Sequence, residues 1–468
     1  MTNEDEVAAD SEGHAKKSLP RETVERCKSE PLCREGGEVA EDQGGPPLGY
    51  FATVASRGFH RMAKEELLLR LQPTCLESHN GKLFFSTQLP PGAPEFSEVR
   101  SVERMFVCVQ RVDRNKTGEK LLPDDKAAAM AKLQQAILTD AQWEACVQWW
   151  RRSTGNDTVD DAGAPSPISF RVKVNKSGKH TSHVRTEEIA GRIGMCLKER
   201  FPAWKVDLKH GALEVNVHVA DDYWVVGLPF LRQAVVGSGH IVNPGLHPTV
   251  SWAIARAGGI QSNDVVCDPM CGKAVILIEA SRHWPLASYV GVDKEREYLD
   301  LALGNFARAC PNAHRTLTQG DCTRLPLRDA SVDVMLCDLP FGKMHGTVEG
   351  NQTLYPKMMC EAARVVRPGG KAVLLTSDSN SDLMESQVGA EGEQFKAGKW
   401  ALVAKHPVKI GFKMPTHIYL LYRLGLGDEH LQDVVRDLGL KGSGWDVVCA
   451  KKSWRKRWLS ERPAMESI

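Results

Sequence analysis

The strongest chemical signal in the sequence is the motif CDLPFG at residues 337–342, which directly follows the apolar stretch VDVML. A carboxylate, any residue, proline and an aromatic at the end of a buried strand are suited to methyl transfer onto an exocyclic amine. The N–H groups of such an amine would donate to Asp338 and to a backbone carbonyl near Leu339 or Pro340. These bonds hold the nitrogen closer to tetrahedral, while Phe341 stacks on the base. The motif also fits an ordinary turn after a strand.

A second segment, VVCDPMCGKAVILIEA at residues 265–280, has the pattern of a strand, a loop and a helix that bind a nucleotide-type cofactor. Asp293 ends the next apolar stretch, about 20 residues after Gly272, where an acid that accepts the ribose hydroxyls belongs. Asp321 follows at the expected end of a third strand. It is placed either to receive an adenine amine or simply to form a turn.

A dinucleotide site is the main competing interpretation, since it uses the same kind of fold and the same acid. The chain lacks G-x-G-x-x-G, however, and S-adenosylmethionine carries no phosphate, so its loop needs fewer glycines. Methyl transfer is an in-line displacement that depends on positioning and needs no metal. A base inside a duplex cannot reach such a pocket, so the acceptor must be single-stranded or flipped out.

The composition fits a soluble intracellular protein. The 468 residues are 42% hydrophobic and 25% charged, and 60 basic residues balance 59 acidic ones, so RNA binding would depend on local patches. The 13 cysteines include no C-x-x-C pair, which argues against a disulfide framework or a zinc site. No apolar run is long enough to span a membrane. We expect a cytosolic or nuclear protein.

The pattern of elements divides the chain into several parts. Before the cofactor loop we expect a disordered tail at residues 1–47 and a small α+β unit at 48–112. An insertion or linker with one helix should follow at 113–165, and a second α+β unit at 166–232. Residues 240–424 alternate strands with helices, which predicts a doubly wound parallel sheet with its ligand at the carboxyl ends of the strands. Residues 425–468 contain the basic, aromatic stretch KKSWRKRW, which fits an RNA-binding segment, a nuclear localisation signal or a surface helix.

Taken together, FRVKVNKSGKH, VVGLP, NPGLHPTVSWAIA, DPMCG and DLPFG resemble the eukaryotic THUMP-domain RNA methyltransferases that form N2-methylguanosine. The resemblance covers roughly residues 48–424. It implies an N-terminal ferredoxin-like domain, a THUMP domain and a Rossmann-fold, S-adenosylmethionine-dependent methyltransferase domain. The segments YWVVGLPFLRQ, PTVSWAIA and RHWPLASYVGVD are most similar to the branch that acts on U6 spliceosomal RNA. That branch implies a nuclear location and a small zinc-binding activator subunit.

The resemblance also assigns roles to individual residues. Asp338, Pro340 and Phe341 would hold the guanine amine. The cofactor would be bound by Thr249, Asp268, Cys271, Gly272, Ala274, Asp293 and Asp321. Thr249 would lie at the methionine end of the cofactor, although it equally fits a helix N-cap. RNA phosphates would be met by Arg171, Lys173, Lys176, Lys179 and His180, unless these residues form an ordinary solvated face.

The chain departs from the family in the cofactor loop. The family usually reads D-P-x-C-G-x-G followed by Ser or Thr, and this chain has Ala274 and Val275 there. Alanine disfavours a positive φ and adds a methyl group near the cofactor, and valine removes a possible hydroxyl hydrogen bond. We expect S-adenosylmethionine to bind about ten- to a hundredfold more weakly. Three functions remain open: methylation of U6 RNA, methylation of transfer RNA, and RNA binding with a weakened or inactive methyltransferase domain.

Overall fold

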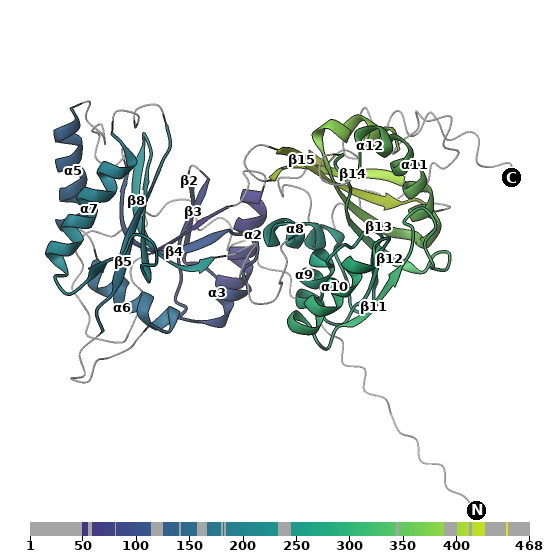
Figure 1. Cartoon of the computed structure of the whole chain (residues 1–468), viewed down its shortest axis with the longest axis horizontal. Coiled ribbons are helices and arrows are strands. Elements are labelled where there is room, and N and C mark those ends of the chain that lie inside the picture. Colours follow the sequence, from purple (N-terminus) through teal and green to yellow (C-terminus); the bar gives the residue numbers. More distant parts are fainter. Residues whose placement is uncertain are drawn as a thin grey trace, which may run out of the picture.

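The computed structural model describes residues 49–54, 59–79, 81–113, 125–139, 142–156, 166–178, 181, 184–232, 245–342, 346–387, 400–410, 414–425 and 446–447. These residues form two lobes, each built on an eight-stranded sheet (Figure 1). No helix in the described part of the chain is both long and apolar enough to cross a membrane.

The N-terminal lobe joins both predicted α+β units in one sheet of order β2-β3-β1-β4-β8-β7-β5-β6. Its strands are β1 (Tyr50–Thr53), β2 (Cys75–His79), β3 (Lys82–Ser86), β4 (Arg104–Asp113), β5 (Ser169–Lys176), β6 (Lys205–Val206), β7 (Leu213–Val219) and β8 (Tyr223–Arg232). The two units meet where β4 pairs antiparallel with β8. Within the second unit, β7 and β8 form a hairpin and pair antiparallel from Asn216↔Gly227 to Val219↔Trp224.

The described residues of this lobe include the helices α2 (His60–Leu71), α3 (Pro94–Glu98), α5 (Lys126–Thr139), α6 (Trp143–Thr154) and α7 (Thr186–Arg200). Their apolar residues, among them Leu67, Leu133, Trp150 and Ile193, share one buried cluster with sheet residues from both units. The two units therefore have a common core.

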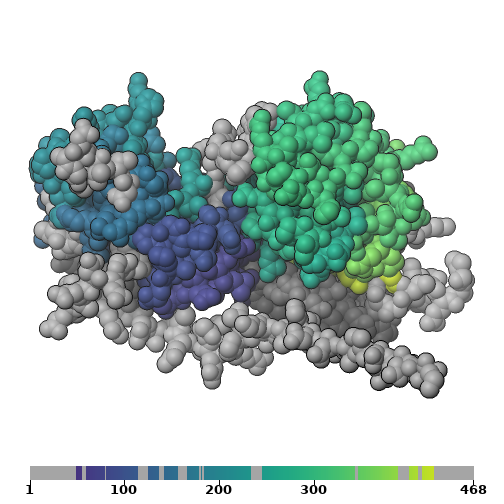
Figure 2. All heavy atoms as spheres, turned by 90° about the horizontal axis from the view of Figure 1, so that it is seen from below, coloured from purple at the N-terminus to yellow at the C-terminus, as the bar shows by residue number. Residues whose placement is uncertain are grey.

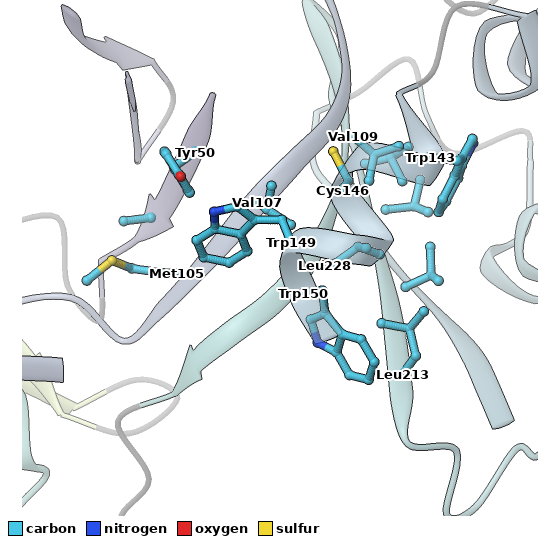
Figure 3. Close-up of a cluster of buried hydrophobic side chains, with 14 of the residues drawn as sticks. Tyr50, Met105, Val107, Val109, Trp143, Cys146, Trp149, Trp150, Leu213 and Leu228 are labelled. Carbon is cyan, nitrogen blue, oxygen red and sulfur yellow. The ribbon is translucent and has the colours of Figure 1, made fainter. Parts of the chain in front are cut away.

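The sequence interpretation of residues 113–165 as a linker around one helix is wrong for residues 143–154. The expected helix is α5, but α6 follows it, with Trp143, Cys146, Val147 and Trp150 all buried. This i, i+3, i+4, i+7 spacing is that of an amphipathic helix. Trp149 of α6 packs against Tyr50 of β1, with ring centroids 5.2 Å apart (Figure 3). The segment thus supplies part of the core.

The C-terminal lobe has the sheet order β11-β10-β9-β12-β13-β15-β14-β16. Its strands are β9 (Val265–Asp268), β10 (Ser288–Asp293), β11 (His314–Gln319), β12 (Val332–Asp338), β13 (Val366–Ser377), β14 (Trp400–Ile410), β15 (Met414–Arg423) and β16 (Asp446–Val447). The first five are parallel, as predicted. The sheet as a whole is mixed, because β15 pairs antiparallel with β13 and β14, and β16 with β14.

Helices α8 (Pro248–Gly258), α9 (Val275–His283), α10 (Arg296–Ala309), α11 (Val348–Val365) and α12 (Ser381–Ser386) pack around this sheet, and the short 3-10 helix Asp378–Asn380 precedes α12. Two separate buried clusters lie among them, one with α8, α9 and α10 and the other with α11 and α12. Helices on both faces of a largely parallel sheet make a doubly wound α/β fold.

The first unit of the N-terminal lobe lies against the C-terminal lobe. Figure 2 shows the purple residues near the start of the described chain between the teal and green parts. Phe59 and Met62 belong to the buried cluster of the C-terminal lobe. The ring of Phe59 stacks on that of His406 at a centroid distance of 5.9 Å. The contact between the lobes is therefore partly apolar and buried.

Candidate active site

Three neighbouring strands of the C-terminal lobe each end in an aspartate. Asp268 ends β9, Asp293 ends β10 and Asp338 ends β12. Strand β9 lies between the other two, and the strand order reverses beside it. The carboxyl ends of parallel strands at such a reversal are where doubly wound folds bind ligands. The structure thus brings together three of the acids singled out from the sequence.

The Asp293 carboxylate at the end of β10 accepts hydrogen bonds from the loop after β9 and from the turn after β10. Gly272 N–H donates to Asp293 Oδ2 at 2.7 Å, and Glu295 N–H donates to Asp293 Oδ1 at 2.9 Å. A carboxylate oxygen accepts more than one hydrogen bond, so Asp293 retains capacity for hydroxyl donors. Gly272 has φ +50°, and a Cβ built on it would meet no atom within 4 Å. The backbone of Gly272 therefore borders open space and is bonded to Asp293.

Ala274 does adopt the conformation that a glycine would favour. Its φ and ψ are +60° and +28°, and it is the N-cap of α9. The backbone strain expected from the sequence is therefore confirmed. The expected crowding of the cofactor is not, because Ala274 is fully buried by protein atoms in the core of the lobe. Its methyl group packs inward and does not narrow the open space at Gly272.

Val275 also has a packing partner that the sequence did not indicate. A Cβ built on Gly245 would lie 2.9 Å from Val275 Cγ2, so the valine side chain sits directly against the glycine backbone. The neighbouring Cys271 is buried, and its N–H donates to Val292 O at 2.9 Å. Residues 271–275 therefore form a well-packed loop despite the missing second glycine.

Thr249 is not the N-cap of α8, which corrects one of the two roles that the sequence left open. The N-cap is His247, whose Nδ1 accepts from Thr249 N–H at 3.3 Å and lies 2.7 Å from Thr249 Oγ1. Thr249 is fully buried in the first turn of α8. A contact with the methionine end of the cofactor stays a prediction.

Asp321 forms a turn in this structure. Its Oδ1 accepts from Thr323 N–H at 2.8 Å and from Thr323 Oγ1 at 2.7 Å, and the residue is exposed. These bonds lower the pKa of the Asp321 carboxyl. Asp321 Oδ2 is not used in these bonds, so a contact between Asp321 and the adenine amine stays a prediction.

Asp338 presents a buried acceptor atom. The residue is only partly buried, but its Oδ1 is buried and has no hydrogen-bond partner among the described residues. The next backbone carbonyl, that of Leu339, likewise accepts no bond from the described chain, while Leu339 N–H donates to Leu375 O at 2.9 Å. A buried acceptor without a partner costs free energy, and a substrate N–H group would remove that cost.

The carbonyl of Pro340 is already occupied. It accepts from Asn351 Nδ2 at 2.8 Å and from the Tyr355 hydroxyl at 2.8 Å. A carbonyl oxygen has two lone pairs, so Pro340 has no acceptor left for a substrate. Of the two carbonyls that the sequence left open, the structure favours Leu339. Phe341 packs partly buried against the core, and stacking on a base stays a prediction.

Asp268 and Asp338 hold protons more tightly than ordinary carboxyls. Burial, with smaller contributions from Asp338 and Asp293, raises the pKa of Asp268 to about 8. Burial also raises the pKa of Asp338 to about 7. A cationic ligand beside these groups would favour their ionised forms. A positively charged cofactor bound at these strand ends would therefore lower the pKa of both carboxyls.

The basic residues proposed for RNA binding differ in their surroundings. Arg171 pairs with Glu214 at 2.6 Å and donates to Lys209 O at 3.1 Å. Lys176 Nζ donates to the carbonyls of Thr181 and Val184 and so holds the segment before α7. Lys173 is exposed. Lys179 and His180 lie outside the described residues.

Sequence reasoning missed several residues around the site, among them His247, Asn305, Asn351, Tyr355 and Asn380. The spacing of Asn351 and Tyr355, four residues apart on α11, was the one available signal, since it places both side chains on the same helix face. What they contact depends on the tertiary fold.

Two family models match the chain. A THUMP domain model matches residues 156–228, and an RMKL-like methyltransferase domain model matches residues 241–399. The THUMP match lies in the N-terminal lobe and includes β5, α7 and β7. The methyltransferase match contains Asp268, Asp293 and Asp338.

Several curated proteins are similar in sequence. The U6 snRNA (guanine-N(2))-methyltransferase THUMPD2 of Mus musculus is 28% identical over 413 residues, which cover 72% of this chain and 77% of that protein. The Bos taurus protein of the same name is 36% identical over 46% of this chain and 42% of its own length. The tRNA (guanine(6)-N(2))-methyltransferase THUMP3 of Bos taurus is 31% identical over 46% of this chain and 45% of its length. The chain thus spans less than half the length of the two Bos taurus relatives.

The fold also matches a solved structure. TrmN from Thermus thermophilus superposes with a TM-score of 0.61 at 21% identity, covering 80% of this chain and all of that one. The overall architecture of two lobes is therefore shared. With both models matched in order, the chain contains a THUMP domain followed by an RMKL-like methyltransferase domain.

Proposed function

We propose that this protein uses S-adenosylmethionine to methylate N2 of one guanosine in U6 spliceosomal RNA. The observation that carries the proposal is the buried Asp338 Oδ1 beside the carbonyl of Leu339, two acceptors that receive no hydrogen bond from the described residues. Two adjacent acceptors match the two N–H groups of one exocyclic amine. Similarity over most of the chain to the Mus musculus U6 snRNA enzyme supports the choice of RNA.

The residues at the strand ends fit the cofactor. The open space beside Gly272 leaves room for it, and Asp293 has lone pairs for the ribose hydroxyls. When bound, S-adenosylmethionine supplies a methyl group on a positively charged sulfur. Asp268 and Asp338 lie at the carboxyl ends of neighbouring strands, where their carboxylates would offset that charge.

The chain itself positions the amine and accepts its proton. Asp338 Oδ1 and Leu339 O accept one N–H each, which directs the nitrogen lone pair toward the methyl donor. After transfer, N2 must lose a proton. The pKa of Asp338, raised to about 7 by burial, makes this carboxylate a suitable acceptor near neutral pH.

We further propose that the enzyme works in the nucleus with a small zinc-binding activator subunit. Among the described strands, β11 pairs with β10 alone and forms one edge of the sheet. An exposed edge of this kind accepts an added strand from a partner. Co-purification of the activator with the full chain would support this part of the proposal.

The function is tested by incubating the full chain, with and without the activator subunit, with S-adenosylmethionine and either U6 RNA or transfer RNA transcripts. Nuclease digestion and mass spectrometry then identify N2-methylguanosine. We expect the product in U6 RNA and its absence with the Asp338→Ala variant.

Other outcomes separate the alternatives. Product in transfer RNA alone would support the methyltransferase activity but make transfer RNA the substrate, as for the THUMP3 relatives. Absence of S-adenosylmethionine binding at millimolar concentration, together with retained RNA affinity, would make the protein an RNA-binding module. Cytoplasmic retention in cell fractionation would overturn the nuclear part of the proposal.

A further inference from the structure

The turn at residues 338–341 is fixed by side chains from outside the motif. Asn351 and Tyr355 lie on α11, one helical turn apart, and both donate to Pro340 O at 2.8 Å. Both side chains are almost completely buried. The Thr347 side chain accepts from Gly350 N–H at 2.9 Å and caps the helix, which sets the position of Asn351 relative to the turn.

Tyr355 also ties the turn to the neighbouring strand. Its hydroxyl lies 2.7 Å from Thr376 Oγ1 on β13. Since the single phenolic proton goes to Pro340 O, the threonine hydroxyl is the donor in that contact. Burial raises the pKa of Tyr355, so its hydroxyl keeps the proton that it donates. Asn380 adds a longer contact, from Nδ2 to Phe341 O at 3.4 Å.

The bonds fix the peptide planes on both sides of the Leu339 carbonyl. On one side, Leu339 N–H donates to Leu375 O at 2.9 Å. On the other side, Pro340 O is held by two donors, and the proline ring restricts φ at that residue. The Leu339 carbonyl lies between these two anchored planes. Its direction is therefore set by α11 and β13 as well as by the motif.

We propose that Asn351 and Tyr355 are positioning residues for methyl transfer, which hold the turn so that Asp338 Oδ1 and Leu339 O face the substrate amine together. They occupy the carbonyl of Pro340, which would otherwise compete with that of Leu339 for the amine. The proposal rests on the proposed function, because it assumes that an exocyclic amine is the acceptor. It assigns to α11 a role that the D-L-P-F motif by itself does not reveal.

The test uses Tyr355→Phe, which removes one donor and keeps the ring. We expect kcat with U6 RNA to fall about tenfold, because one acceptor becomes misaligned. The dissociation constants for S-adenosylmethionine and for RNA should stay unchanged, since neither binding surface is altered. Asn351→Ala should give the same pattern, and the variant with both changes should lose more kcat than either alone.

Tyr289→Phe is the matched control. Tyr289 is equally buried, and its hydroxyl donates to Trp284 O at 2.7 Å on another part of the same lobe. Both phenylalanine variants should lower the melting temperature to a similar extent, but only Tyr355→Phe should lower kcat. Equal effects of the two variants on kcat would overturn the proposal and leave Tyr355 with a purely structural role.

A second readout depends on Asp338. In an Asp338→Asn background, where the aligned carboxylate is already lost, Tyr355→Phe should lower kcat by much less than in the wild-type background. Full additivity would contradict the positioning role. A wild-type protein that methylates no RNA would overturn the proposed function and this inference together, whereas an active wild type with a normal Tyr355→Phe variant would overturn the inference alone.

Discussion

Arg100 and Glu279 join the two lobes through a two-pronged ion pair, with Nε to Oε1 at 2.6 Å and Nη2 to Oε2 at 2.8 Å. Glu279 lies on α9, the helix whose first turn follows the cofactor loop. Two further residues extend the contact. His283 Nε2 lies 3.3 Å from Glu279 Oε1, and Arg70 Nη2 lies 3.4 Å from His283 Nδ1. The N-terminal lobe is thus bonded directly to the helix that supports the cofactor loop.

Removal of one partner should weaken the fold strongly. Glu279→Gln leaves the mostly buried guanidinium of Arg100 without its counter-charge, and we expect the free energy of unfolding to fall by about 3–5 kcal/mol. Urea denaturation measures this. The control is Arg296→Ala, which breaks an exposed pair with Asp300 and should cost less than about 1 kcal/mol. A similar loss of unfolding free energy in both variants would show that the buried pair stabilises the fold no more than the exposed one.

The same carboxylate predicts a pH dependence of stability. Burial raises the pKa of Glu279, but hydrogen bonds from His283 and Arg100 outweigh it and lower the pKa to about 2. Because the folded-state pKa lies below the unfolded one, the stabilisation is present above about pH 4.5 and disappears as the pH falls toward 2. Wild type and Glu279→Gln should therefore converge in stability over this range. Parallel curves would contradict the assignment.

The activity should rise with pH through about 7. Asp338 must be ionised to accept both the N–H bond and the proton, and burial raises its pKa to about 7, so the protonated fraction grows below that pH. We expect kcat/KM to fall below neutrality in the wild type. The Asp338→Asn variant should have a lower kcat/KM, and its kcat/KM should not fall further below neutral pH. A wild-type rate that increases on acidification would contradict the role of the carboxylate.

The two loop positions should respond differently to substitution. Ala274→Gly relieves about 1 kcal/mol of backbone strain and loses one buried methyl group, worth about 0.8 kcal/mol, so stability should hardly change. Because that methyl group packs into the core, the affinity for S-adenosylmethionine should stay within about threefold of wild type. This replaces the larger effect expected from the sequence.

Gly272→Ala is the contrasting change. It places a methyl group in the open space beside Asp293 and forces alanine to φ +50°. We expect S-adenosylmethionine affinity, measured by isothermal titration calorimetry, to fall more than about tenfold. Equal affinities of Gly272→Ala and Ala274→Gly would show that the cofactor does not approach this glycine.

The basic residues of the N-terminal lobe should separate into RNA contacts and structural contacts. If the predicted contact of Lys173 with RNA phosphates exists, Lys173→Ala should weaken RNA affinity and reduce its salt dependence, because the side chain is exposed to solvent. Lys176→Ala should mainly lower the melting temperature, because its ammonium bonds two backbone carbonyls. Electrophoretic mobility shift and thermal denaturation distinguish the two. Reversed effects would contradict the division.

The sequence alone determined much of the C-terminal lobe. Alternating apolar stretches and helical segments predicted the parallel strands, and the residue types at their ends marked Asp293 and Asp338, while Asp268 was assigned through the family resemblance. Such patterns are local, because the period of a strand or helix and the turn that ends it depend on a few neighbouring residues. The missing glycine at Ala274 likewise predicted a strained φ, which the structure confirms.

Other features were decided only by the tertiary structure. Whether the Ala274 methyl group faces the core, which carbonyl of the D-L-P-F turn is free, and which lysines are tied to backbone depend on residues far apart in the chain. The same is true of α6 and of the shared sheet, since β4 and β8 are more than a hundred residues apart. Local periodicity carries no information about such partners, because packing between distant elements selects them.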